Sequence, residues 1–393
     1  MRCLSAPPGS PASRFASPRA SSPLLVYHLT GSALTIGVAY ALQFLPFALA
    51  GLVGGSLADR LDRRTLMVSC DLLRFAVVAV LVAGVLLKFL SLAQIYASIA
   101  VISVCAAIFA GGEASSIPFV LGKERATQAV ATLIAAEQGA NLIAPPIGGA
   151  LFTLGGALPA LAVNALTYLV SFGAISRIAT LGPETAGRLP TWSELVADIR
   201  VGFRFMWSDT AMRAITLLSL GLNLFGMMAG AIYIPFFKAA LGASDAQVGL
   251  TLGIGAVGTM CGSLLAGAVA GRWPFGAALC ISYALDAVVF VPVIFLHNLW
   301  LVTAFWAAAN ACAGFETAQI VSWRMRVIPQ DSVGRVFGAA RLIVLIGIVP
   351  GSIAGGFLAQ LYGARLPVIV ATFGYLILAL SALLIPAVRR DER

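Results

Sequence analysis

The side chains of this sequence that could do chemistry are mostly acids set in apolar stretches. Asp286 lies at the centre of the stretch 276–296, where an acid in hydrocarbon costs about 2.5–3.5 kcal/mol on insertion scales. Glu137 lies close to Gln138 and Asn141 in a second stretch. Acids in such places need a charged partner, a hydrogen bond or a water-filled cavity, and many bind protons or cations. Asp286 and Glu137 are therefore candidates for proton or cation coupling.

A repeated tetrapeptide adds two more candidate acids. Ala-Gly-Gly-Glu, ending at Glu113, recurs as Ala-Gly-Phe-Glu, ending at Glu316. Two interpretations of all four acids stay open. They bind protons or cations, or they fill structural roles in interhelical hydrogen bonds or in a pair with an arginine such as Arg341.

Asp71 and Arg74 form a different kind of candidate. They lie three residues apart, so a helix places them on one face, where they can form an ion pair. A charge that is neutralised within its own helix favours a structural role over transport.

The composition decides which elements position these side chains. Of the 393 residues, 60% are apolar and 10% are charged, with a mean hydropathy of +0.96. A globular protein typically carries about 25% charged residues, because its surface must face water. Forty glycines fit close helix packing in lipid. The sequence therefore predicts an all-α membrane protein that spans the bilayer many times.

The motifs of several other protein classes are absent. There is no Gly-x-x-x-x-Gly-Lys-Ser/Thr loop for ATP, no Gly-x-Ser-x-Gly elbow and no Cys-x-x-Cys pair. His28 and His297 are the only histidines, too few for a histidine zinc centre. We expect no enzyme activity, no cofactor and no metal.

A spanning helix needs roughly 20 apolar residues, and eleven stretches qualify. They are 34–57, 66–88, 92–119, 129–153, 158–177, 214–237, 247–270, 276–296, 299–321, 336–361 and 366–387. Alternate loops hold most basic residues, beginning with Arg60, Arg63 and Arg64, whereas the opposite loops hold only Lys88, Lys238 and Arg365. This asymmetry places the C-terminus in the cytoplasm. The net charge of +9 thus reflects orientation, and we expect no nucleic-acid partner.

The repeat indicates two related helical bundles joined by a linker. The predicted parts are an aberrant or disordered segment 1–22, a bundle 23–177, a linker 178–213 with an amphipathic surface helix, a bundle 214–387 and a cytoplasmic tail 388–393. Two bundles of six predict twelve helices, so the first of twelve is missing from the eleven. A transit peptide or a natural disordered tail would explain residues 1–22. We favour a misplaced start or a frameshift that removed most of the first helix.

The loop after the first stretch carries a motif. Gly55 is followed by Asp59, Arg60, Arg63 and Arg64 in the pattern Gly-x-x-x-Asp-Arg-x-Asp-Arg-Arg. This loop resembles the signature of the major facilitator superfamily. Together with the flanking segments 25–33, 43–46 and 71–74, it resembles the bacterial exporter branch that contains the enterobactin exporter and macrolide efflux proteins. Its carboxylate and arginines suit a cytoplasmic gate, although the arginines alone would also fix topology.

The resemblance implies further sites. The run Ala-Pro-Pro-Ile-Gly-Gly, with Pro145, Gly148 and Gly149, resembles the superfamily's antiporter motif, with alanine replacing its leading glycine. Ordinary helix packing is the alternative interpretation. The resemblance also implies a central cavity whose candidate residues either contact substrate or serve only in packing. These candidates are Asn223, Phe225, Trp306, Asn310, Gln138 and Asn141.

The expected protein is a two-bundle transporter of the major facilitator type in the bacterial cytoplasmic (inner) membrane. It would exchange protons for small hydrophobic or amphipathic compounds, such as drugs, macrolides or siderophore-like molecules, and export them by alternating access. Its partners would be that substrate, protons and the lipid bilayer, and it would act as a monomer. The alternatives are an importer of the same fold and a truncated membrane sensor or inactive remnant that transports nothing.

Overall fold

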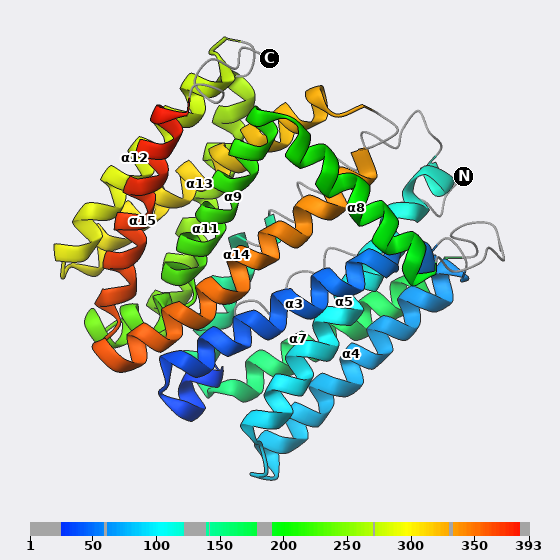
Figure 1. Cartoon of the computed structure of the whole chain (residues 1–393). Helices are drawn as coiled ribbons and strands as arrows, with labels where there is room; N and C mark the ends of the chain where they lie inside the picture. The colour runs from blue at the N-terminus through cyan, green and yellow to red at the C-terminus, as the bar shows by residue number, and fades with distance from the viewer. Residues whose placement is uncertain are drawn as a thin grey trace. The chain divides into compact units, whose positions relative to one another are not determined.

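The computed structural model describes residues 25–58, 61–121, 139–140, 142–178, 191–269, 272–329 and 333–385. Over these residues every regular element is a helix (Figure 1). The labelled helices are α3 (Ala33–Ala58), α4 (Arg63–Leu86), α5 (Leu92–Leu121), α7 (Ala157–Ile175), α8 (Trp192–Ser208), α9 (Thr210–Gly230), α10 (Tyr233–Pro235), the π-helix η1 (Phe236–Ala240), α11 (Asp245–Val269), α12 (Phe275–Phe295), α13 (Leu299–Val327), α14 (Val333–Tyr362) and α15 (Arg365–Leu384). Two shorter helices cover 25–30 and Leu142–Gly155.

Nine helical segments within the described ranges are long and apolar enough to cross a membrane. They belong to α3, α4, α5, α7, the run from α9 to η1, α11, α12, α14 and α15. The protein is therefore a multi-pass membrane protein. The predicted count of eleven stays a prediction, because the structure describes the predicted span 129–153 only in part and α13 is interrupted by polar residues such as Glu316.

Helix α4 shows how these helices suit lipid. Asp71 and Arg74 are buried on one face, whereas Leu72 and Val80 are exposed on the other. A surface helix of a water-soluble protein has the opposite pattern, with apolar residues inside and charges outside. The outward leucine and valine match hydrocarbon, and the inward charges are kept from it.

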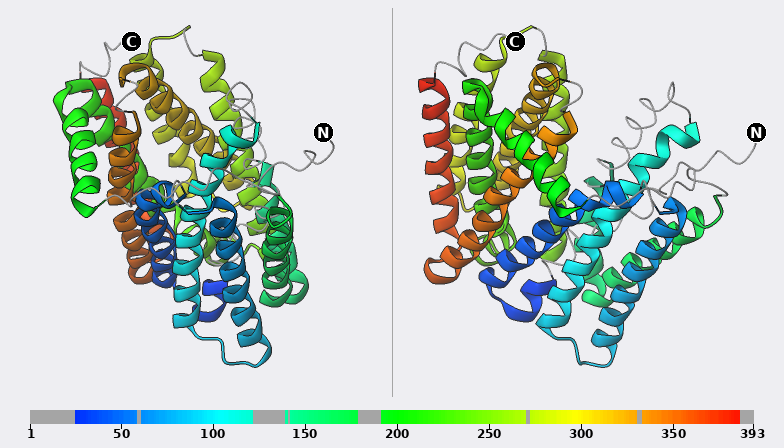
Figure 2. Two further views of the ribbon diagram at one scale, coloured as in Figure 1. Left: turned by 90° about the vertical axis from the view of Figure 1, so that its right-hand side faces the viewer. Right: turned by 45° about the vertical axis from the view of Figure 1, so that its right-hand side comes forward.

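The contacts divide the chain into two compact units. The first comprises Met1–Thr30, Leu42–Thr191 and Ser244–Gly253, and the second comprises Gly31–Ala41, Trp192–Ala243 and Ile254–Arg393. In the first unit α4 packs against both α5 and α7, and the three helices run side by side in Figures 1 and 2. Met67, Cys70, Cys105, Phe109 and Ile175 form a core cluster there.

In the second unit α14 packs along α9, and α12 packs against α13 and α15. The contact of α14 with α9 uses glycines at successive turns. An ideal Cβ built on Gly347 would lie 2.6 Å from the carbonyl oxygen of Leu220. The corresponding distances are 2.3 Å from Gly351 to Leu224 and 2.2 Å from Gly355 to Met228. Because no side chain intervenes, the two backbones touch, as small residues allow in membrane helices.

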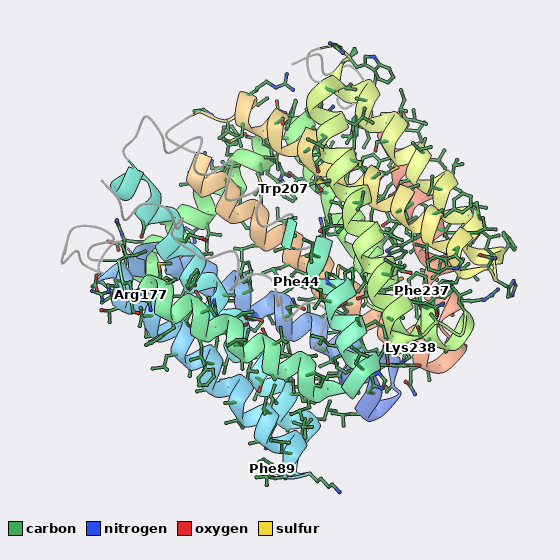
Figure 3. All side chains as sticks on the ribbon, turned by 180° about the vertical axis from the view of Figure 1, so that it is seen from behind. Phe44, Phe89, Arg177, Trp207, Phe237 and Lys238 are labelled. Carbon is green, nitrogen blue, oxygen red and sulfur yellow. The ribbon has the colours of Figure 1, made fainter. Side chains whose placement is uncertain are left out.

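Helix α8 lies in the predicted linker and belongs to the second unit. It has one buried side, where Met206 is fully enclosed, and an exposed side with Arg200 and Arg204. Its contacts are with α14 and α9. The exposed Trp207 near its end, labelled in Figure 3, suits the membrane interface, where tryptophan is enriched.

The contact of α9 with α14 predicts unequal effects for two glycines of α14. Gly351→Ala should lower the free energy of unfolding by about 1–3 kcal/mol, because its methyl group would collide with a backbone carbonyl. Gly338→Ala, with no atom within 4 Å of the new Cβ, should be neutral or slightly stabilising. Thermal unfolding in detergent measures both. Equal midpoints for the two variants would contradict the packing argument.

Candidate functional site

The structure places the predicted gate loop between α3 and α4. Gly55 lies in α3, and Arg63 and Arg64 begin α4, whereas Asp59 and Arg60 fall outside the described residues. The Arg64 guanidinium donates a hydrogen bond to the Ser176 carbonyl oxygen, just after α7. This arginine therefore joins the start of α4 to the end of α7, and a gating role for the loop stays a prediction.

Asp62, also in this loop, is the N-cap of α4. Its carboxylate accepts hydrogen bonds from the backbone amides of Arg64 and Thr65, at 3.4 and 2.9 Å. The hydroxyl of Thr65 donates a further hydrogen bond, which is the main cause that lowers the pKa of the Asp62 carboxyl. The cap satisfies amides that have no partner within the helix and so defines where α4 begins.

The run with Pro145, Gly148 and Gly149 lies in the helix Leu142–Gly155. Gly149 meets Gly249 of α11: an ideal Cβ on Gly149 would lie 2.4 Å from the Asp245 carbonyl oxygen and 3.0 Å from the Gly249 Cα. On the other side, an ideal Cβ on Gly249 would lie 2.5 Å from the Pro145 carbonyl oxygen. Gly148 faces no atom within 4 Å. Gly149 is thus required for helix contact in the first unit, and Gly148 is not.

The structure brings Asp71 and Arg74 together. Arg74 Nη1 lies 3.2 Å from Asp71 Oδ1, and Ser171 of α7 donates a hydrogen bond to the other carboxylate oxygen. The guanidinium lies 5.0 Å from the ring centroid of Phe109 and 5.6 Å from that of Tyr168. The Asp71 carboxylate and the two rings therefore stabilise the buried guanidinium, and the Ser171 hydroxyl stabilises the carboxylate. This arrangement fits the structural role expected from the spacing of Asp71 and Arg74.

The acids of the two repeats lie in different units. Glu113 is buried on α5 in the first unit, and Glu316 is buried on α13 in the second. Asp286 of α12 is also in the second unit and 1% exposed. Ser282, one helical turn before Asp286, donates a hydrogen bond of 3.0 Å to Glu316 Oε1. Asp286 and Glu316 therefore lie at one contact between α12 and α13 in the second unit.

Several polar atoms at this contact have no hydrogen-bond partner within the described part of the chain. They are both carboxylate oxygens of Asp286, Oε2 of Glu316, the hydroxyl of Tyr283 and Nε of Arg324. Arg324 uses Nη2 to contact the Thr216 hydroxyl at 3.4 Å. A buried ionised carboxylate without partners is costly. This contact holds three unpartnered carboxylate oxygens, and Glu113 Oε1 in the first unit is another among the described residues.

The structure brings only two of the predicted cavity residues together among those it describes. Trp306 and Asn310 of α13 lie together beside Gly255 of α11, where an ideal Cβ would be 3.2 Å from Trp306 Nε1 and 3.4 Å from Asn310 Nδ2. Phe225 of α9 packs instead against Gly374 of α15. The Asn223 amide donates to the Ser219 carbonyl oxygen at 2.7 Å. Glu137, Gln138 and Asn141 lie outside the described residues.

An aromatic cluster surrounds Trp306. Its ring centroid lies 5.9 Å from that of Tyr233, 6.0 Å from Phe237 and 6.3 Å from Phe290. Tyr233 and Phe237 come from the segment in which α9 gives way to α10 and η1. Figure 3 labels Phe237 beside Lys238 on that π-helical turn. Such turns are frequent at functional sites. This one carries the Phe237 ring to the tryptophan, and α10 just before it carries the Tyr233 ring.

One polar contact in the first unit is not predictable from the sequence. His28 Nε2 lies 3.0 Å from Asp245 Oδ1, and the imidazole stacks on Phe152 with centroids 5.5 Å apart. A cavity of about 370 Å³ adjoins it, lined by His28, Phe152, Lys88 and apolar side chains. The two partners are 217 residues apart, and no local pattern connects such distant positions.

Two sequence comparisons each match most of the chain. A sequence model of the Major Facilitator Superfamily matches residues 13–295 and 216–393. The multidrug efflux pump Tap of Mycolicibacterium fortuitum is 26% identical over 379 residues, covering 93% of this chain and 91% of Tap.

Solved structures with the same fold include three transporters. A bacterial homologue of the iron transporter ferroportin, in an inward-facing state, has a TM-score of 0.73 at 15% identity and covers 95% of this chain and 96% of its own. A bacterial homologue of the lysosomal transporter Spinster, inward-facing and occupied, has a TM-score of 0.74 at 15% identity, covering 97% and 95%. The nucleoside transporter NupG has a TM-score of 0.75 at 12% identity, and the match covers 95% of this chain and 97% of NupG.

Two adjacent glycines test the role of the proline–glycine run. Gly149→Ala should destabilise the protein by about 1–3 kcal/mol, because its Cβ would collide with the backbone of α11. Gly148→Ala should leave the unfolding midpoint unchanged. Thermal unfolding and transport are measured on both variants. Loss of transport in Gly148→Ala at an unchanged midpoint would contradict a role in packing alone.

The cap of α4 predicts a pH dependence. The folded state lowers the Asp62 pKa, so the cap's contribution is full above the unfolded value of about 3.9 and is lost as the pH falls through the lower folded value. An asparagine side chain at the same position also caps well but does not titrate. At neutral pH, Asp62→Asn should therefore change stability little and Asp62→Ala should cost about 0.5–2 kcal/mol.

Unfolding midpoints of the three proteins across acid pH measure this effect. The wild type should lose stability relative to Asp62→Asn as the pH falls. Parallel curves for the two proteins would contradict the proposed cap.

Proposed function

Because the chain belongs to the major facilitator superfamily, we propose that it is a secondary active exporter of small hydrophobic or amphipathic compounds. The observation that carries this proposal is the similarity to a multidrug efflux pump over 93% of the chain. Export is driven by proton exchange, and the chain acts as a monomer in the bacterial inner membrane with its C-terminus in the cytoplasm. The charge asymmetry of the loops supports this orientation.

The aromatic cluster around Trp306 supports the choice of substrate. Trp306, Tyr233, Phe237 and Phe290 present ring faces and edges, and Asn310 adds an amide beside them. Sites for organic ligands combine an apolar, aromatic wall with a few polar groups. Flat amphipathic compounds, cationic ones among them, match such a wall.

The proposed mechanism is alternating access by two bundles, 23–177 and 214–387, with the linker 178–213 on the cytoplasmic side. In this proposal the helix Leu142–Gly155 and α13 also cross the bilayer, which makes eleven spans. Asp59, Arg60, Arg63 and Arg64 form the cytoplasmic gate, and breaking their contacts opens it. Substrate and protons bind in turn, and the proton gradient supplies the free energy for transport in place of ATP, for which the sequence has no Gly-x-x-x-x-Gly-Lys-Ser/Thr loop.

Ethidium efflux from proteoliposomes tests the function. A pH gradient should drive ethidium transport in the export direction by the wild type, and collapsing the gradient should abolish it. Trp306→Ala should weaken ethidium binding by roughly tenfold, since aromatic anchors contribute most binding energy. Trp300→Ala is the matched control, because Trp300 lies on the same helix and is half exposed at its start.

Three results would contradict the proposal. Gradient-driven uptake in the opposite direction would indicate an importer. Ethidium binding without any flux would indicate a sensor. Equal effects of Trp300→Ala and Trp306→Ala would exclude the aromatic cluster as the binding site.

A further inference from the structure

We propose that the cavity beside His28 in the first unit binds an anionic phospholipid, whose phosphate contacts Lys88 and whose acyl chain enters the apolar interior. The proposal goes beyond the proposed function, because the lipid is not transported and its binding does not depend on the direction of transport. The site has three parts. They are an apolar interior, an exposed lysine in the wall and a surrounding rim of exposed apolar side chains.

Three segments that are far apart in the sequence form the wall of the cavity. They are residues 25–29, residues 84–90 at the end of α4 and in the turn after it, and residues 152–157, where α7 begins. All three belong to the first unit. Apart from His28 and Lys88, the side chains of the wall are apolar or glycine. The volume of about 370 Å³ is at the lower end of the range for ligand pockets, about 300–1,000 Å³, so the cavity admits part of a lipid.

Lys88 supplies a positive charge that no acid compensates. Its side chain is exposed and forms no ion pair or hydrogen bond within the described part of the chain. On its own helix hairpin, Asp62 caps the opposite end of α4. Asp71, which pairs with Arg74, lies roughly 20 Å earlier along the helix axis. A lysine ammonium without a counter-charge is suited to bind phosphate as a point charge.

Asp245 contacts the wall of the cavity through His28, and it has its own partners. His28 Nε2 lies 3.0 and 3.1 Å from the two carboxylate oxygens. Asp245 also stands in the first turn of α11, where the helix dipole favours a negative charge. The carboxylate holds the imidazole, which stacks on Phe152, and it is not itself part of the wall. Lys88 is therefore the charge that selects the ligand, and it favours an anion.

The backbone of Lys88 is strained. Its φ of 59° is in the left-handed region, and among the described residues it is the one non-glycine residue with a positive φ. Lys88 directly follows Leu87, the C-cap of α4, and glycine is the usual residue where a helix ends in this conformation. Residues held in strained conformations cluster at functional sites and ligand clamps. The strain therefore points to a role for the lysine side chain.

Exposed apolar side chains flank two segments of the wall. Leu87 and Phe89 lie on either side of Lys88, and Leu154 follows Phe152 by two residues. Leu87 is 71% exposed and Leu154 is 83% exposed. Figure 3 labels Phe89 at the tip of the turn between α4 and α5. Exposed apolar patches mark sites of membrane contact, so the ligand of this cavity reaches it from the bilayer.

The bilayer and the charge together select the ligand. A lipid with an anionic headgroup satisfies the lysine and the apolar wall at once, whereas a soluble anion satisfies only the lysine. The same positive charge disfavours the cationic compounds proposed as substrates, and the aromatic cluster around Trp306 lies in the second unit. A bound lipid would contact all three segments of the wall, so it should stabilise the folded state.

Lipid titration of the purified full chain in detergent tests the site. Phosphatidylglycerol should bind roughly fivefold more tightly than phosphatidylcholine with the same acyl chains, which is the attraction of one lysine for an anionic headgroup. Native mass spectrometry counts the bound lipids, and the unfolding midpoint measures the stabilisation. Lys88→Asn should abolish the preference, because asparagine tolerates the same φ and carries no charge. Lys238→Asn, which removes a lysine of the second unit, should keep it.

Lys88→Gly separates lipid binding from folding. Without lipid it should raise the unfolding midpoint, because glycine adopts the positive φ without strain, and it should lose the preference for phosphatidylglycerol. A lysine that only complements the dipole at the end of α4 would give the opposite pattern, a lower midpoint and an unchanged preference. Ala157→Phe, which adds a ring to the wall, should weaken phosphatidylglycerol binding by roughly fivefold or more, and its midpoint without lipid shows that it folds.

Four results would overturn the lipid site. They are equal affinity for the two lipids, a preference that survives Lys88→Asn, displacement of phosphatidylglycerol by glycerol phosphate, and its displacement by ethidium. Glycerol phosphate would identify a site for a soluble anion, and ethidium would place the cavity on the transport route. Absence of proton-driven ethidium efflux would overturn the proposed function alone, because lipid binding is measured without transport.

Discussion

Contacts between glycine and backbone carbonyl groups hold the helices of each unit together. Lipid tails are as apolar as leucine, so membrane helices gain little by hiding apolar side chains from lipid and must gain stability from close packing. Gly149 and Gly249 make such a contact in the first unit, and Gly351 and Gly262 make it in the second. The small separation between backbones keeps lipid out of the contacts, which allows polar groups to lie beside them.

The two units use that protected space differently. The first encloses an ion pair whose charges cancel and whose aromatic neighbours cover the guanidinium. The second encloses Asp286 and Glu316, three of whose four carboxylate oxygens have no hydrogen-bond partner among the described residues. Buried atoms without such a partner also occur in the first unit, among them Arg74 Nε and Glu113 Oε1. An acid paired with an arginine on its own helix keeps its charge at lower cost than a buried acid without a charged partner.

Features determined by local sequence could be predicted, and features determined by tertiary contact could not. Apolar length gives the helices of the structure to within a few residues, and the spacing of Asp71 and Arg74 gives their contact. Ser171, the hydrogen-bond partner of Asp71, is 100 residues away, and nothing in the sequence distinguishes it from the other serines. Likewise the family resemblance nominates Trp306 as a cavity residue, but its ring partners depend on how α9 ends.

That ending also escapes prediction. The change from α9 to the π-helical turn η1 involves phenylalanines and alanines that fit an α-helix equally well. The bond pattern is decided by tertiary packing around Tyr233 and Phe237. Conversely, Phe225 has the same residue type and depth as a cavity residue, yet it packs on Gly374. Residue type therefore suggests which side chains could line a cavity, and the helix face on which each lies decides whether it does.

The placement of charge also bears on how the chain enters the membrane during synthesis. Helix α4 brings its counter-charge with it, since Asp71 and Arg74 pair within one helix, and it can leave the translocon alone. Helix α12 carries Asp286 with no partner on its own turns, and α13 follows after three residues. Insertion of α12 and α13 together, as a helical hairpin, would keep both carboxyl groups away from lipid from the start. Membrane insertion of α12 therefore depends on α13, whereas α4 can insert as a single helix.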